Sequence, residues 1–106
     1  MDKLIPSKES LTVEFKSDKK KLSDETLIDS VVAFANTECG DLYLGVEDNG
    51  HVSGRHESHK DFSRLSAFIA KKTIPPVYVM VEQVEEELNV IKIRVTESCS
   101  IVESFY

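Results

Sequence analysis

Four lysines lie close together near the start of the chain, at positions that could bind phosphate groups: Lys16, Lys19, Lys20 and Lys21. An ammonium group binds phosphate oxygens as a point charge, which gives affinity without sequence choice. A second basic group consists of Arg64, Lys71 and Lys72. We predict that both groups contact the backbone of a nucleic acid. For Lys16 the alternative is an ion pair with Glu14 on the same face of a strand, worth under about 1 kcal/mol.

The residues Asn36, Thr37 and Gly40 offer a second kind of phosphate contact. Short polar side chains and backbone N–H groups in such a turn can face a phosphate. The alternative is a structural turn, in which the same residues end a helix and lead into a strand. We favour the structural alternative, because Asn and Gly are the usual residues at the end of a helix.

His56 and His59 are spaced as a metal-binding pair would be, but no second pair of ligands completes a tetrahedral zinc site. We therefore predict that these histidines lie in a solvated loop. The N-terminus has no apolar stretch of signal-peptide length, so we expect no export and a cytoplasmic location. In that compartment Cys39 and Cys99 are expected to be reduced residues rather than a disulfide.

The chain of 106 residues fits one domain, because this length leaves no room for a second core. With 41% apolar and 30% charged residues the composition is globular, and no apolar run is long enough to span a membrane. The net charge of −6 argues against general phosphate binding, since nucleic-acid-binding surfaces are usually basic. Acidic residues concentrate at 82–87, which leaves a basic face elsewhere compatible with the total.

The apolar pattern predicts the elements that hold these groups. Residues 11–16 alternate apolar and polar side chains, as a half-buried strand does. Ser23 can cap a helix that begins near Asp24, and the apolar spacing continues to about Asn36. The lysines at 19–21 then lie in the loop between this strand and this helix.

The middle of the chain predicts a strand, a tight turn and a second helix. Residues 42–46 are mostly apolar and indicate a buried strand. Asn49-Gly50 is typical of a type I′ hairpin, which would lead into a short return strand at Val52. A helix is expected from about residue 60 to 72, with basic side chains at its C-terminal end.

Two further strands are expected at residues 77–81 and 88–95, joined as a hairpin by an acidic connection at residues 85–87. The predicted order of elements is β-α-β-β-α-β-β. We therefore expect a single α+β domain, with a mixed, mostly antiparallel sheet and two helices packed on one face.

Residues 9–16 read ESLTVEFK, and residues 33–50 read AFANTECGDLYLGVEDNG. These segments resemble the opening motif and the AFANT-x-GG-x-L-x-x-GV-x-D-x-G signature of the Schlafen AlbA-like family, also called the divergent AAA domain. Val52-Ser-Gly54 and Ile74-Pro-Pro76 fall where that family commonly has V-x-G and I-x-P. The resemblance covers roughly residues 9–95. It implies a nucleic-acid-binding module, such as the DNA-binding part of a transcriptional regulator.

The chain departs from the family pattern at two places. Cys39 stands where the family has the first glycine of its GG pair, so the backbone path of this loop is expected to differ. The sequence ends at Tyr106, near where a final strand and an arginine-containing motif would follow. We therefore expect a shortened C-terminal part and an open sheet edge, through which copies of the chain could form a dimer. No Walker-type G-x-x-x-x-G-K-[ST] motif is present, so ATP hydrolysis is not expected.

The resemblance also implies a nuclease alternative. Some Schlafen proteins are RNA endonucleases with two carboxylates in an E-x-x-x-x-E opening and one after the GV-x-D strand. Glu9, Glu14 and Asp48 occupy those positions here. Clustered carboxylates can orient Mg²⁺ or Mn²⁺ against a scissile phosphate, and no other cofactor is expected. In the structural alternative, Glu14 pairs with a lysine and Asp48 starts the Asn-Gly turn.

Three hypotheses therefore follow from the sequence. The first is a nucleic-acid-binding module, and the second is a metal-dependent endoribonuclease. The third is a protein-interaction or oligomerisation domain, which the net charge of −6 and the expected open edge favour.

Overall fold

The structure, a computed structural model, describes residues 5–59, 61, 63–84, 89–96 and 101–106. In chain order, the regular elements within these residues are β1 (Val13–Lys16), α1 (Asp24–Asn36), β2 (Gly40–Leu44), the 3-10 helix η1 (Glu57–His59), α2 (Ser63–Lys71), β3 (Thr73–Ile74), β4 (Met80–Val84), β5 (Val90–Val95) and β6 (Glu103–Ser104). Neither α1 nor α2 has the length and apolar character needed to cross a bilayer.

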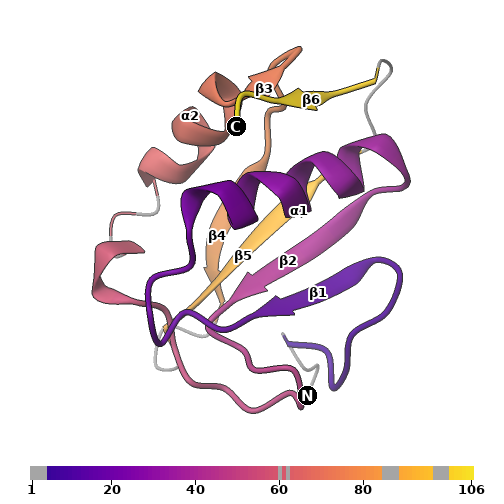
Figure 1. Cartoon of the computed structure of the whole chain (residues 1–106). Coiled ribbons are helices and arrows are strands. Elements are labelled where there is room, and N and C mark those ends of the chain that lie inside the picture. Colours follow the sequence, from indigo (N-terminus) through magenta and orange to yellow (C-terminus); the bar gives the residue numbers. More distant parts are fainter. Residues whose placement is uncertain (1–4, 60, 62, 85–88, 97–100) are drawn as a thin grey trace.

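Strands β1, β2, β5 and β4 form one mixed sheet in that spatial order (Figure 1). β1 runs parallel to β2, and its register places Phe15 beside Tyr43. β5 pairs antiparallel with both β2 and β4, which confirms the predicted hairpin of the last two long strands. β3 and β6 form a separate antiparallel pair. The α+β fold with a mixed, mostly antiparallel sheet is thus confirmed.

Helix α1 begins where the capping pattern predicts. The Ser23 hydroxyl accepts a hydrogen bond from the Thr26 backbone N–H, and the acidic Asp24 and Glu25 occupy the first turn. Carboxylates are favourable there because the helix dipole is positive at its N-terminus. α1 and α2 cover the same face of the sheet, as expected (Figure 1).

The sheet buries apolar side chains on both faces. On the helix face, the strands β2 and β5 contribute Leu42, Leu44, Ile91, Ile93 and Val95. A smaller cluster on the opposite face includes Phe15 and Tyr43, whose rings meet edge to face with centroids 6.1 Å apart. Because side chains alternate along a strand, Glu14 and Lys16 lie on the helix face.

Charged side chains on the same face of the sheet, opposite the helices, are paired across strands. Asp41 lies between two cations, with Arg94 Nε at 3.0 Å and Lys92 Nζ at 4.0 Å. Lys92 Nζ also lies 3.7 Å from the Glu82 carboxylate. Acids and bases therefore neutralise one another here, and this face of the sheet is not a basic surface.

Several details of the predicted hairpins are wrong. A type I′ turn needs positive φ at both central residues. Gly50 has φ 88°, but Asn49 does not have positive φ, and the Gly50 N–H donates to the Glu47 carbonyl instead. The return strand predicted at Val52 is reduced to a single antiparallel bridge with Val46. The strand predicted at residues 77–81 begins three residues later, as β4.

Candidate nucleic-acid interface

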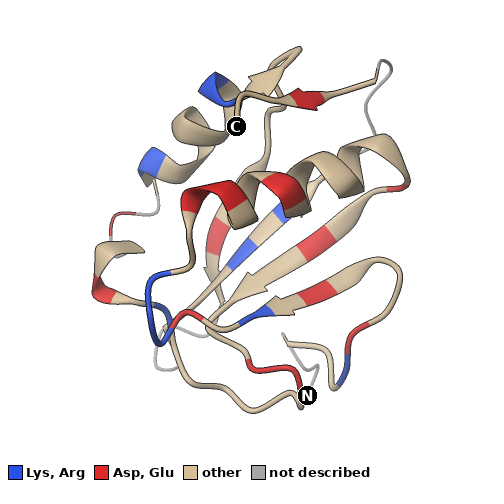
Figure 2. Cartoon of the chain, in the orientation of Figure 1, with Lys and Arg blue, Asp and Glu red and all other residues tan. Residues whose placement is uncertain are grey.

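The loop between β1 and α1, residues 17–22, presents the exposed lysines Lys19, Lys20 and Lys21. Figure 2 shows this basic loop beside the acidic first turn of α1. Lys16 belongs to β1 rather than to the loop, and its Nζ is 3.9 Å from the Glu14 carboxylate on the same strand. The ion pair considered as the alternative for Lys16 is therefore present.

A buried aspartate within this loop fixes the position of its lysines. The Asp18 side chain has no exposed surface, and it accepts hydrogen bonds at 2.7 Å from the backbone N–H groups of Leu22 and His56. His59 Nδ1 lies 2.6 Å from the same carboxylate. Burial alone would raise the pKa of Asp18, but these hydrogen bonds outweigh burial and hold the pKa below its usual value. Asp18 is therefore an ionised acceptor that ties the lysine loop to η1.

A cavity of about 280 Å³ opens between the lysine loop, η1 and α2. We call it the α1–α2 cavity, and its lining residues are Lys21, Asp24, Ser58, His59, Asp61, Arg64, Leu65 and Phe68. Lys21 and Arg64 come from the two basic groups found in the sequence, so the fold brings one member of each group to a single site. Leu65 and Phe68 add apolar side chains to the lining of the same cavity.

Each of these two cations has an acidic partner three residues away. Lys21 Nζ lies 3.3 Å from Asp24, and Arg64 Nε lies 3.2 Å from Asp61. Exposed pairs of this kind contribute about 1 kcal/mol or less. The cavity also lies at the N-terminal ends of α1 and α2, where the helix dipoles favour an anion. A phosphate group could therefore replace either carboxylate at small cost.

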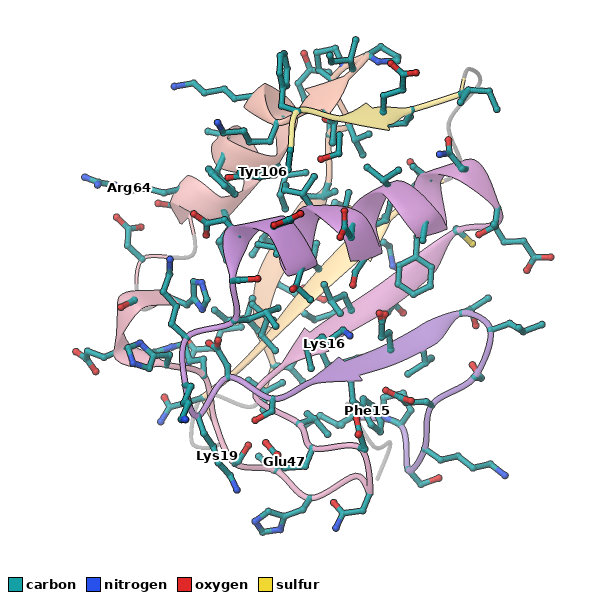
Figure 3. The ribbon with its side chains drawn as sticks, in the orientation of Figure 1. Phe15, Lys16, Lys19, Glu47, Arg64 and Tyr106 are labelled. Carbon is teal, nitrogen blue, oxygen red and sulfur yellow. The ribbon has the colours of Figure 1, made fainter. Side chains whose placement is uncertain are left out.

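The remaining basic residues of the second group, Lys71 and Lys72, lie at the far end of α2. Lys71 is exposed, and Lys72 Nζ lies 5.2 Å from the centroid of the Tyr106 ring in a cation–π contact. Desolvation raises the pKa of Tyr106, and the nearby acids Asp24 and Glu25 raise it further. Tyr106 therefore lies between α2 and the first turn of α1, as Figure 3 shows.

Asn36 and Thr37, considered as phosphate contacts, have structural partners. The Asn36 side-chain amide donates to the Val102 carbonyl at 2.9 Å, and its oxygen accepts from the Val102 N–H at 2.8 Å. The Thr37 hydroxyl donates to the Ala33 carbonyl at the end of α1, at 2.8 Å. These contacts support the structural alternative for both residues.

The three carboxylates of the nuclease alternative are not brought together. Glu9 accepts a hydrogen bond from the Phe15 N–H at 2.8 Å, so its carboxylate is held against the backbone of β1. Glu14 accepts a hydrogen bond from the Ser30 hydroxyl of α1 at 3.0 Å, on the helix face of the sheet. Asp48 is exposed in the turn after β2. In the described part of the chain, no three His, Cys, Asp or Glu residues are placed to hold a metal ion.

A carboxylate that sequence reasoning did not single out lies beside the lysine loop. Glu47 accepts a hydrogen bond from the Ser53 hydroxyl, and hydrogen bonds from Ser53 and Ser17 hold its pKa below the usual value. Lys19 adds a smaller attraction, and Figure 3 shows Lys19 and Glu47 near each other. Glu47 therefore partly neutralises Lys19, as Asp24 does Lys21.

The prediction of a solvated loop is wrong for His59, whose side chain is 4% exposed. Neither His59 nor Asp18 belongs to an apolar pattern, and the pair joins residues distant in sequence, so the sequence carries no signal for it. The tyrosines of the two strands predicted at residues 42–46 and 77–81 differ in exposure. Tyr43 is buried, whereas Tyr78 is 79% exposed and available for contact.

Comparisons with known proteins agree with this architecture. The family model described as Schlafen, AlbA_2 matches residues 9–106. The DIP2311 protein from Corynebacterium diphtheriae has a similar structure, with a TM-score of 0.64 and 24% sequence identity; the match covers 89% of this chain and 22% of that one. A comparison with curated protein sequences found no match. Because the family model spans nearly all of the sequence, this chain belongs to the Schlafen AlbA_2 family.

Proposed function

We propose that this chain is a nucleic-acid-binding module, and specifically a DNA-binding part of a transcriptional regulator. The observation that carries the proposal is the meeting of Lys21 and Arg64 at the α1–α2 cavity. Phosphates bind along the surface from the lysine loop, past the cavity, towards Lys71 and Lys72 on α2. Family membership supports a nucleic-acid-related role of this kind.

The distribution of charge is compatible with a net charge of −6. Asp41 and Glu82 lie on the face of the sheet opposite the helices, where Lys92 and Arg94 neutralise them. The outer surface of α1 carries Glu25 and Asp29 and would repel phosphates (Figure 2). A bound strand is therefore expected to follow α2 rather than α1.

The proposal is tested by anisotropy titrations with labelled duplex and single-stranded probes over a salt series. Replacing Lys19 and Lys20 with glutamate is expected to weaken binding by about 10-fold and to lower the steepness of the salt dependence, since each phosphate contact contributes about 0.7–0.9 to the log–log slope. The control is Lys8→Glu, which reverses a single exposed lysine outside the loop. If the wild type bound no probe at low salt, or if Lys8→Glu weakened binding equally, the proposal would be wrong.

A second function, self-association through the edge strand β4, has one specific observation in its favour. The two edges of the four-stranded sheet differ, because β1 is blocked where the Glu9 carboxylate takes the Phe15 N–H and Ser10 bridges to Val13. At the β4 edge, Met80 is 70% exposed. A strand at the end of a sheet that carries an exposed apolar side chain is a site where a second copy can pair.

If β4 pairs with a second copy, Met80→Lys is expected to raise the dimer dissociation constant by about 10-fold, because a lysine on an edge strand opposes pairing. Sedimentation velocity over a concentration series measures this constant. Leu11→Lys is the matched control, since Leu11 is 90% exposed beside the blocked edge. A wild-type protein that remains monomeric at every concentration would rule out this second function.

A further inference from the structure

The α1–α2 cavity has the size and the mixed polar and apolar lining of a site for a single nucleotide. Its volume of about 280 Å³ lies just below the range of about 300–1,000 Å³ for small-molecule sites. Its lining combines the cations Lys21 and Arg64 with their acidic partners Asp24 and Asp61, and it adds the apolar side chains of Leu65 and Phe68. A nucleotide has a similar combination, with a charged phosphate at one end and an apolar base face at the other.

Resting on the nucleic-acid-binding function proposed above, we propose that this cavity takes one unpaired nucleotide of a strand, with its phosphate between Lys21 and Arg64 and its base against Phe68. Bases in a duplex are stacked inside the helix and cannot enter a concave site, whereas unpaired bases stack on aromatic side chains. The protein therefore prefers single strands to duplexes.

Buried contacts preorganise the polar side of the cavity. His59 lines the cavity, and its Nδ1 is engaged by the buried Asp18 carboxylate. This contact fixes the orientation of the ring and leaves Nε2 as the nitrogen that it can offer to a ligand. The two exposed ion pairs, Lys21 with Asp24 and Arg64 with Asp61, occupy the cationic groups until a phosphate replaces their acidic partners.

Tyr106 provides a second ring for the neighbouring base. Its side chain is 51% exposed, and the pKa of its hydroxyl responds to Asp24 and Lys21, both of which line the cavity. Lys72 lies over this ring and is placed for the next phosphate. The bound strand thus runs from the lysine loop, through the cavity, to Tyr106 and the end of α2 (Figure 3).

The test compares four labelled probes of equal length by anisotropy: an oligothymidylate, an oligouridylate, an abasic deoxy strand and a duplex. The abasic strand keeps the phosphates and removes the bases. We expect the oligothymidylate to bind about 10-fold more tightly than the abasic strand, in line with the measured effect of stacking one base. The ratio between oligouridylate and oligothymidylate distinguishes RNA from DNA as the source of the nucleotide.

Two variants then assign this preference to the cavity. Tyr106→Leu and Phe68→Leu are each expected to bring the affinities for oligothymidylate and abasic strand to within about 3-fold of each other. Tyr78→Leu, which changes an exposed tyrosine outside the cavity lining, is expected to leave the preference unchanged. Because Tyr106 is half exposed, its replacement tests the inference even if Phe68→Leu destabilises the fold.

The outcomes separate this inference from the proposed function. If the abasic strand or the duplex bound as tightly as the oligothymidylate, with binding still sensitive to Lys19 and Lys20, the nucleotide site would be wrong and the nucleic-acid-binding function would stand. A preference that persists in Tyr106→Leu and in folded Phe68→Leu would also overturn the site. If no probe bound, both would fail.

Discussion

Replacing Asp18 with asparagine is expected to lower the free energy of unfolding by about 3 kcal/mol, since hydrogen bonds to a buried charged acceptor each contribute about 1.5–3 kcal/mol and donors left unsatisfied cost more. The asparagine side chain has nearly the same size, but one of its two oxygen acceptors becomes an NH₂ donor. It cannot accept all of the hydrogen bonds that Leu22, His56 and His59 direct at Asp18. Urea unfolding of the two proteins at neutral pH measures the difference. Asp29→Asn, at an exposed position of α1, is the control and is expected to change stability by less than about 0.5 kcal/mol.

The hydrogen bonds to Asp18 also predict the direction in which the stability of the protein changes with pH. The pKa of Asp18 is lower in the folded protein than its ordinary value of 3.8. A carboxyl whose pKa falls on folding stabilises the protein above its unfolded pKa, and this stabilisation is lost as the pH falls through the lower, folded value. The difference in stability between the wild type and Asp18→Asn is therefore expected to be largest well above pH 3.8 and to shrink in stronger acid. A difference that stayed constant through this acid range would contradict the role assigned to the Asp18 carboxylate.

Most of the fold follows from local sequence patterns. Ser23, the acidic first turn and the apolar spacing after it predict α1 to within a residue, because all three signals describe the same local backbone. The Asn49-Gly50 turn shows where such reasoning ends. The dipeptide indicates a turn, but the bond between the Gly50 N–H and the Glu47 carbonyl sets its type. The position of β4 depends in the same way on pairing with β5, which lies later in the chain.

The candidate site was predicted less well, because its geometry depends on contacts between distant residues. The i,i+3 pairs of Lys21 with Asp24 and of Asp61 with Arg64 are visible in the sequence, but their meeting at one cavity is not. Motif spacing has a related weakness. Glu9 and Glu14 match an E-x-x-x-x-E spacing, yet one caps the edge of β1 and the other faces α1. A fixed spacing along the chain therefore does not imply that two carboxylates share a metal ion.

Reversing both cavity cations, in a Lys21→Glu/Arg64→Glu variant, is expected to weaken binding of single-stranded nucleic acid by about 100-fold at low salt, or about 10-fold for each position. The reason is local: each substitution removes a phosphate partner, and together the two add two carboxylates beside Asp24 and Asp61. The log–log salt slope is expected to fall by about 1.4, which corresponds to two contacts on a single strand. Anisotropy over a salt series measures both quantities, and the free energy of unfolding is expected to change by less than about 1 kcal/mol per position, since both ion pairs are exposed.

A charge-compensated variant distinguishes the effect of the net charge on nucleic-acid binding from the effect of local geometry at the cavity. Lys21→Glu combined with Glu38→Lys keeps the net charge at −6, because the reversed charges cancel, and Glu38 lies in the turn after the C-terminal end of α1. If a phosphate binds at the cavity, this variant is expected to bind as weakly as Lys21→Glu alone, within about 2-fold, since screening at physiological salt limits exposed charges to about 8 Å. Recovery of wild-type affinity by the distant lysine would mean that binding follows overall charge, and would remove the reason for assigning it to the α1–α2 cavity.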